Sequence, residues 1–137
     1  MKIEGKMWKD GNHWVVYVPI LDISTQGRSK KDALAMIEDA IQVEAEREGL
    51  KIRAVLGQNP GAFTVSANDP DLLIAFLLKR QRTCHRLSIR DVAARLDASS
   101  PTAYAQYEQG KRAPSLSKLQ DLLHAIDPKL DAVLGIG

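Results

Sequence analysis

Residues 99–115 read SSPTAYAQYEQGKRAPS, and this stretch decides how the second half of the chain is interpreted. Ser100 followed by Pro101 is typical of a helix start, because a serine side chain caps free backbone amides and proline needs no amide hydrogen in the first turn. Gly110 predicts the end of that helix. We therefore expect a short helix, with Ala103, Tyr104 and Tyr107 packed inward at helical spacing.

The other face of this predicted helix is uncharged and rich in amide and hydroxyl groups. It consists of Thr102, Ala105, Gln106 and Gln109. Glutamine can form two hydrogen bonds to adenine, and the methyl groups of threonine and alanine can contact thymine in the major groove. Lys111 and Arg112 follow the helix, where basic side chains can reach phosphates. The alternative is an ordinary polar helix face that contacts solvent and binds no ligand.

The preceding helix adds to the same predicted surface. Ser88 and Arg90 begin it, and the free amides at a helix N-terminus favour anions such as phosphate. The predicted DNA-contacting residues are Ser88, Arg90, Ser99, Ser100, Pro101, Thr102, Ala105, Gln106, Gln109, Lys111 and Arg112.

Capping residues divide residues 68–137 into five short predicted helices. Asp69-Pro70 opens the first, and Ser88, Ser100 and Ser115 open the next three. Asp127-Pro128 predicts a fifth helix that ends at Gly135. A compact all-α domain is therefore expected in residues 68–137.

The charge distribution is uneven although the net charge is only +2. Residues 1–67 hold nine basic and nine acidic residues, whereas residues 72–137 hold ten basic and six acidic residues. A basic excess favours nucleic acid as a partner, but it is also typical of an ordinary solvated surface. Charge alone leaves both interpretations open.

The first 18 residues predict a β-hairpin around Asp10-Gly11, with Trp8 opposite His13 and Met7 opposite Trp14. One face would then carry core residues. The other face would carry a tryptophan, a tyrosine, a histidine and a valine, which is unusual for a surface that contacts only water. These residues are Trp8, His13, Val15 and Tyr17. A later strand, the second domain or a partner protein would cover them.

A helix should follow Gly27, because Ser29 and Asp32 resemble a capping box and an apolar stripe follows at helical spacing. The helix should end at Gly49, and its far end is acidic and includes Glu44 and Glu48. The sequences KIRAVL and AFTVSA predict further strand structure. We expect residues 1–67 to form an α+β domain of the βββαβ type.

The residues from about 71 to 135 resemble a helix-turn-helix domain of the Cro/Xre repressor type. The resemblance rests on SIRDVAARL and SPTAYAQYEQGKRAPSL. The DASS segment is one residue longer than usual, which leaves the base-facing register open by one position. The first domain resembles the HicB antitoxin family in VVYVP, the TQG turn and SKKDALAMIEDAI, although Pro19-Ile20-Leu21-Asp22-Ile23 replaces the usual Pro-Asp-Leu-Pro-Gly.

These resemblances imply a truncated RNase H-like fold for residues 1–67. They also imply the antitoxin of a type II toxin-antitoxin system. Such a protein binds and inhibits a small HicA-like mRNA-cleaving toxin and represses its own operon by binding promoter DNA. Candidate toxin contacts are Trp8, His13, Val15, Tyr17, Glu44 and Glu48. The alternative is a stand-alone repressor whose first domain senses a small molecule or dimerises.

Catalysis is not expected. Two-metal phosphodiester chemistry needs converging carboxylates, and the strands offer only Glu4, Asp10 and Asp22. The three histidines have no metal-ligand spacing, and Cys84 has no activating histidine on its helix face. We therefore expect no metal and no cofactor.

The remaining expectations concern location and assembly. A single cysteine, no apolar leader and no long apolar run favour a cytoplasmic protein without a membrane segment. We expect a homodimer or higher homo-oligomer, because one such helix reads too few bases for specificity.

Overall fold

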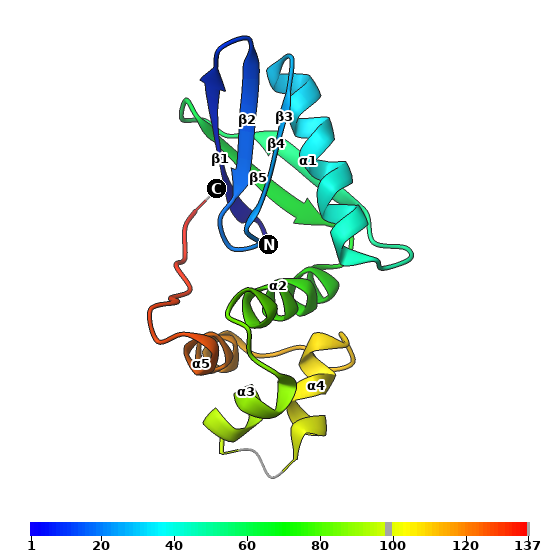
Figure 1. The fold of residues 1–137 in the computed structure, drawn as a ribbon, viewed down its shortest axis with the longest axis vertical. Helices are drawn as coiled ribbons and strands as arrows, with labels where there is room; N and C mark the ends of the chain where they lie inside the picture. The colour runs from blue at the N-terminus through cyan, green and yellow to red at the C-terminus, as the bar shows by residue number, and fades with distance from the viewer. Residues whose placement is uncertain (98–99, 137) are drawn as a thin grey trace. The chain divides into compact units, whose positions relative to one another are not determined.

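The structure is a computed structural model that describes residues 1–97 and 100–136. The chain divides into two compact units, Met1–Leu73 and Ile74–Gly137. The division falls within the helix α2 (Pro70–Cys84), a few residues after the predicted boundary between residues 67 and 68. Figure 1 shows the elements of both units along the chain.

The first unit is a five-stranded antiparallel sheet with one helix. Its elements are β1 (Ile3–Asp10), β2 (His13–Val18), β3 (Ile23–Gly27), α1 (Lys30–Ala45), β4 (Ile52–Leu56) and β5 (Ala62–Ala67). The strands lie in the order β3-β2-β1-β5-β4. The α+β class is confirmed, but the βββαβ pattern is wrong: two strands follow the helix, because Gly61 at a φ of +78° lets the chain return as a hairpin.

The first hairpin has a different register from the predicted one. Asp10 pairs with His13 and Trp8 pairs with Val15, so the turn is Gly11-Asn12 instead of Asp10-Gly11. Gly11 has a φ of +58° at the first central position, where a type II′ turn requires glycine. The observed pairing is shifted by two residues from the predicted one. Side chains on a strand alternate every second residue, so each residue stays on its predicted face, and the two predicted faces are correct.

The core of the first unit lies between α1 and one face of the sheet. Ala33, Ile37 and Ile41 of α1 are fully buried, as are Val16 and Phe63 on the sheet. Burial of these side chains supplies the main stabilisation of the unit. The opposite face of the sheet is therefore the one that carries Trp8 and Tyr17.

The ends of α1 follow the predicted chemistry in part. The Ser29 hydroxyl accepts a hydrogen bond from the Asp32 backbone N–H at 3.0 Å, which confirms the cap. The Asp32 carboxylate accepts from the Arg28 N–H and not from that of Ser29, so the capping box is incomplete. The helix ends at Ala45 with Glu46 in the left-handed region, before the predicted stop at Gly49.

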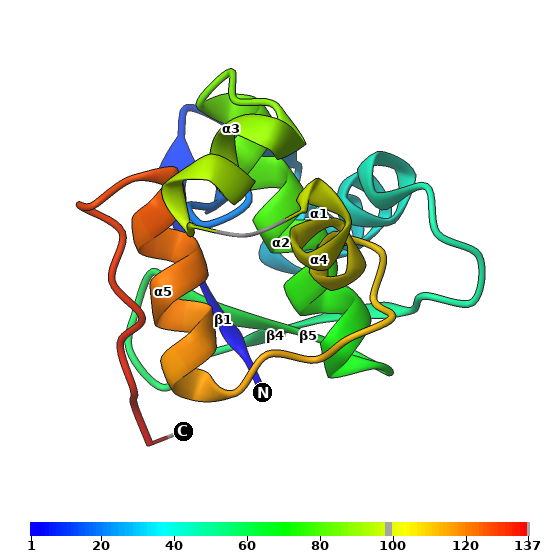
Figure 2. The same cartoon turned by 90° about the horizontal axis from the view of Figure 1, so that it is seen from below.

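The second unit contains most of α2 together with α3 (Ile89–Arg95), α4 (Pro101–Glu108) and α5 (Leu116–Ile126). Figure 2 shows α3, α4 and α5 around α2. Asp69, Ser88, Ser100 and Ser115 accept backbone hydrogen bonds at the four helix starts, as predicted. Buried side chains from every helix form the core, including Leu78, Val92, Tyr104 and Leu122.

The predicted fifth helix is absent from residues 127–136. The Asp127 carboxylate accepts from the Lys129 N–H at 2.9 Å, which makes a local turn at the expected helix start. Beyond it, the Ala132 N–H donates to the Gln120 side chain at 2.8 Å. A segment this short that also contains Gly135 cannot offset the cost of helix nucleation.

None of the described helices is both long and apolar enough to cross a membrane.

Candidate nucleic-acid interface

The helix α4 is fixed at both ends by local hydrogen bonds. The Ser100 hydroxyl accepts from the Thr102 N–H at 3.1 Å, and Pro101 occupies the first helical position. At the other end Gly110 has a φ of +73°, and the Lys111 N–H donates to the Gln106 carbonyl at 3.0 Å. This pattern is a Schellman termination, which requires a residue that tolerates the left-handed region.

A buried ion pair joins α4 to α2. The Arg82 guanidinium donates to both oxygens of the Glu108 carboxylate, with Nε–Oε2 at 2.7 Å and Nη2–Oε1 at 2.9 Å. Arg82 also donates to the Leu87 carbonyl at 2.9 Å, which fixes the segment before α3. The hydrogen bonds that Arg82 donates to the Glu108 carboxylate raise the pKa of Arg82, so the pair stays charged.

The inward face of α4 is formed by Tyr104, Tyr107 and Glu108, all of which are buried. Burial raises the pKa of Tyr104, and the adjacent Glu108 carboxylate adds to the effect. The prediction that Ala103 packs inward is wrong, because its side chain is exposed. Glu108 takes the third inward place instead, since its charge is satisfied by Arg82.

The outward face of α4 is the predicted one. Thr102 and Gln109 are exposed, while Ala105 and Gln106 are half-buried. Thr102, Gln106 and Gln109 lie within about 60° of one another around the helix axis at 100° per residue. A short, uncharged face of hydroxyl and amide groups therefore lies opposite the buried one.

Basic side chains follow α4 directly and also begin the neighbouring helix α3. Arg90 is exposed in the first turn of α3, where Ser88 and Asp91 form a complete capping box through bonds of 3.0 Å and 2.8 Å. Lys111 and Arg112 are exposed just beyond α4. The Arg112 guanidinium lies over the Tyr107 ring at 5.4 Å from its centroid, so its position is partly set before any ligand binds.

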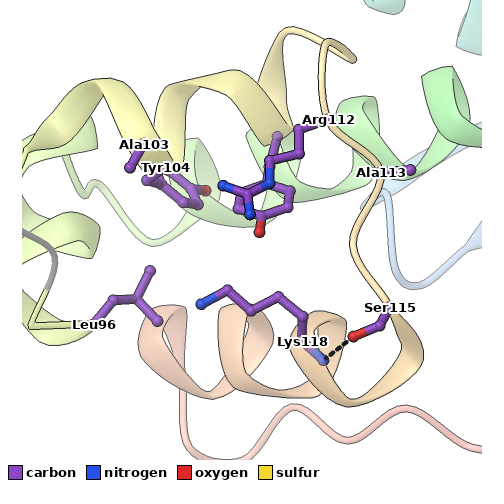
Figure 3. Close-up of a pocket in the computed structure, with 8 residues that line it drawn as sticks. Leu96, Ala103, Tyr104, Arg112, Ala113, Ser115 and Lys118 are labelled. Atoms are coloured by element: carbon purple, nitrogen blue, oxygen red, sulfur yellow. Dashed lines mark hydrogen bonds between the residues drawn. The ribbon is translucent and has the colours of Figure 1, made fainter.

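An open hollow of about 530 Å³ lies between α4 and the start of α5. Tyr104, Tyr107, Arg112 and Lys118 are among its lining residues, and Figure 3 shows the Lys118 side chain extending across it. Lys118 is not among the predicted DNA contacts, because it lies within the apolar pattern of α5. The signal that could have found it is the basic position three residues after the Ser115 cap, whose hydroxyl accepts from the Lys118 N–H.

Two basic residues within the basic segment 72–137 have structural roles. Arg82 forms the buried pair described above, and Arg95 donates to the carbonyls of Ala125 and Ile126 at 3.1 Å each. Arg95 thus caps the C-terminus of α5, where a cation is favourable. The basic excess available to a ligand is therefore smaller than the sequence count indicates.

Residues 78–131 match the helix-turn-helix family. The chain carries a helix-turn-helix domain. The match extends from within α2 to just beyond α5 and contains all of α3 and α4. DNA binding in transcription regulation is the function that this domain supports. No curated protein matches the chain at a significant level.

The helix-turn-helix domain contains every predicted DNA-contacting residue, and one of these, Ser99, lies outside the described residues. Ser88, Pro101 and Thr102 are exposed, and Ser100 is half-buried at its cap. The structure brings the α4 face, Lys111 and Arg112 together. Base contacts by these residues stay a prediction.

The residues predicted to bind a toxin form two separate sets. Trp8 is 47% exposed, His13 is exposed, and Val15 and Tyr17 are half-buried on the sheet face away from α1. The Tyr17 hydroxyl donates to the Asp22 carboxylate at 3.1 Å. Glu44 and Glu48 are exposed on the α1 side, so the structure does not join them to the aromatic set.

Within residues 1–97 and 100–136, no three His, Cys, Asp or Glu side chains are grouped to hold a metal ion. Cys84 is exposed at the end of α2.

Proposed function

We propose that the helix-turn-helix domain binds operator DNA as a dimer, with the outward face of α4 in the major groove. The observation that carries this proposal is the uncharged face of Thr102, Gln106 and Gln109, with the exposed Lys111 and Arg112 just beyond the same helix. Side chains of this kind bond base edges, and basic side chains around them contact phosphates. Lys118, across the hollow from α4, adds a candidate phosphate contact.

Two substitutions separate base reading from phosphate binding. Gln106→Ala should lose about 1–3 kcal/mol on the operator, and only at the base pair that it contacts. Lys111→Ala should weaken binding to all sequences and lower the slope of log K against log salt by about 0.9. Fluorescence anisotropy on a selected operator and on single-base variants measures both effects.

Lys129→Ala is the matched control, because Lys129 is an exposed lysine at the far end of the same unit. It should leave the salt slope unchanged. If Gln106→Ala lowers affinity equally for the operator and for every altered site, then Gln106 does not read a base and the assignment of the α4 face is wrong.

We further propose that the chain is the antitoxin of a type II pair. In this proposal the first unit binds a HicA-like ribonuclease toxin, the second unit represses the operon that encodes both proteins, and the chain acts by binding without catalysis. The proposal is supported by the HicB-like sequence features and by the exposed Trp8 with its neighbours on the sheet face away from α1. Aromatic side chains are enriched at protein interfaces.

In this proposal the acidic residues steer the toxin toward the aromatic residues. Glu44 and Glu48 lie on the other side of the sheet from Trp8, so they attract a basic toxin only at long range. Replacing both by lysine should slow association at low salt and leave the dissociation rate nearly unchanged. Stopped-flow measurements at two salt concentrations test this expectation.

Co-expression with the product of the adjacent gene, followed by pull-down, tests the antitoxin proposal. Trp8→Ala combined with Tyr17→Ala should abolish capture of the toxin and should leave operator binding intact. Leu56→Ala is the matched control, because Leu56 is 49% exposed and pairs with the buried Phe63 on the α1 side of the sheet. Absence of a toxin partner for the wild type would instead favour a stand-alone repressor with a sensing or dimerising first domain.

A further inference from the structure

The two edge strands of the sheet differ in how their backbone groups are covered. On β4, the Ala54 N–H donates to the Glu38 carboxylate at 2.9 Å, and the Ile52 N–H donates to the Gln42 side chain at 3.2 Å. Both acceptors belong to α1, so α1 closes this edge. The other edge is β3. An open edge strand is a template for pairing with another chain.

The hairpin geometry fixes which groups of β3 point outward. The two-residue loop makes Asp10 and His13 a hydrogen-bonded pair, and the backbone direction then alternates along each strand. By this alternation Thr25 points its backbone groups toward β2. The N–H and C=O groups of Ser24 and Gln26 therefore point away from the sheet, and both residues are exposed.

The helix α1 carries an exposed apolar stripe on the flank opposite to Glu38 and Gln42. Met36 is 43% exposed, Val43 is 64% exposed, and Ala40 between them is half-buried. Side chains on one flank of α1 accept hydrogen bonds from β4. The other flank therefore faces toward the edge of the sheet that β3 forms. The stripe and the open edge thus lie on the same side of the unit, and Figure 1 shows α1 beside β3.

We propose that a second copy of this chain pairs its β3 antiparallel to β3 around a two-fold axis at Thr25. Ser24 of one copy then faces Gln26 of the other, and their outward groups exchange hydrogen bonds on both sides of the axis. The stripes of the two α1 helices lie next to each other and lose their exposure to water. An isologous contact of this kind closes at the dimer.

The charges that flank β3 fit this register. Asp22 is exposed just before the strand, and Arg28 is exposed just after it. Antiparallel pairing centred on Thr25 places Asp22 of one copy opposite Arg28 of the other, twice per dimer. Parallel pairing would instead place like charges side by side. The aromatic residues around Trp8 lie on the other face of the sheet and stay accessible in this dimer.

Site-specific cross-linking tests the pairing in the full chain. In a Cys84→Ser background, Thr25→Cys places two thiols at facing positions with Cα atoms about 4.5 Å apart, within the range for a disulfide. Ser24→Cys is the control, because its two copies lie diagonally, about 7–8 Å apart. Under mild oxidation at micromolar concentration, Thr25→Cys should cross-link at least tenfold faster than Ser24→Cys. Equal rates, or no cross-link at residue 25, would overturn the proposal.

A charge test uses the same cross-linking rate as its readout. Arg28→Glu in the Thr25→Cys chain sets two pairs of like charges against each other and should slow cross-linking about tenfold. Adding Asp22→Asn removes the repulsion and should recover part of the rate, since asparagine also tolerates the left-handed φ of +50°. A rate that Arg28→Glu leaves unchanged would contradict the register that places Asp22 opposite Arg28.

Discussion

Removal of Glu108 should unfold the helix-turn-helix domain without unfolding the first unit. Glu108→Ala leaves the Arg82 guanidinium with side-chain exposure of only 13% and without its bidentate carboxylate. Breaking a buried pair by removing one partner costs about 3–5 kcal/mol. A unit of this size has a total stability of about 3–10 kcal/mol. The loss is therefore comparable with the whole stability of the domain.

The same pair should be replaceable by apolar side chains. Arg82→Met combined with Glu108→Leu removes both charges at once, so no buried charge lacks a partner. Replacement of this kind is often neutral or stabilising, although here the Leu87 carbonyl also loses its donor, at about 1 kcal/mol. We expect the double variant to lie within about 2 kcal/mol of the wild type.

The chain offers separate spectroscopic signals for the two units. Trp8 and Trp14 are the only tryptophans and both lie in the first unit, so tryptophan fluorescence follows that unit. Four of the five described helices contribute to the second unit, so far-UV circular dichroism follows mainly that unit. Urea titrations recorded with both signals give one unfolding curve for each unit.

For Glu108→Ala the circular dichroism transition should move to low urea while the fluorescence transition stays in place. The reasoning would be refuted by a Glu108→Ala domain that loses less than about 1 kcal/mol, or by a double variant less stable than the single one. The first result would mean that the Arg82 guanidinium reaches solvent or forms a hydrogen bond to another group when Glu108 is absent. The second would mean that the pair contributes more than its apolar equivalent.

Three further outcomes are expected. The Ser88 N–H holds the pKa of Asp91 below its usual value. The bond from Ser88 to the Asp91 carboxylate should therefore be intact above about pH 3.9 and lost as the pH falls through the lower folded pKa. An NMR titration of the Asp91 carboxyl with its midpoint at or above about pH 3.9 would contradict this. Gly5→Ala should cost the first unit about 1–3 kcal/mol by fluorescence-detected unfolding, because a Cβ would overlap the Phe63 ring, and Phe63→Leu should recover part of the loss. Glu38→Ala should increase aggregation on heating, measured by light scattering, because it uncovers an N–H of β4; equal scattering by both proteins would exclude this role.

Local chemistry explains why the helix starts could be predicted. A serine or aspartate accepts backbone N–H groups two or three residues away, so the interaction is contained in a few consecutive residues. Ser88, Ser100 and Ser115 all cap as expected. The period of the strands is equally local, and so the two faces of the first hairpin were predicted even though its register was not.

Other features depend on residues that are far apart in the chain. Glu108 is buried in α4 because Arg82, 26 residues before it, reaches it across the domain, while Ala103 is exposed. The path of the chain after α5 likewise depends on the bonds that the Gln120 side chain makes to Asp131 and Ala132. No spacing within a single helix contains this information.

The sequence alone determined the helix caps, the faces of the strands and α4, and the division into an α+β part and a helical part, because each follows from short-range hydrogen bonding or periodicity. The tertiary structure decided the functional grouping. It committed Arg82 and Arg95 to the fold, separated Glu44 and Glu48 from the aromatic face, and closed the β4 edge with Glu38 while leaving β3 as the other edge. These arrangements depend on long-range contacts, whose partners are chosen only when the sheet and the helices pack.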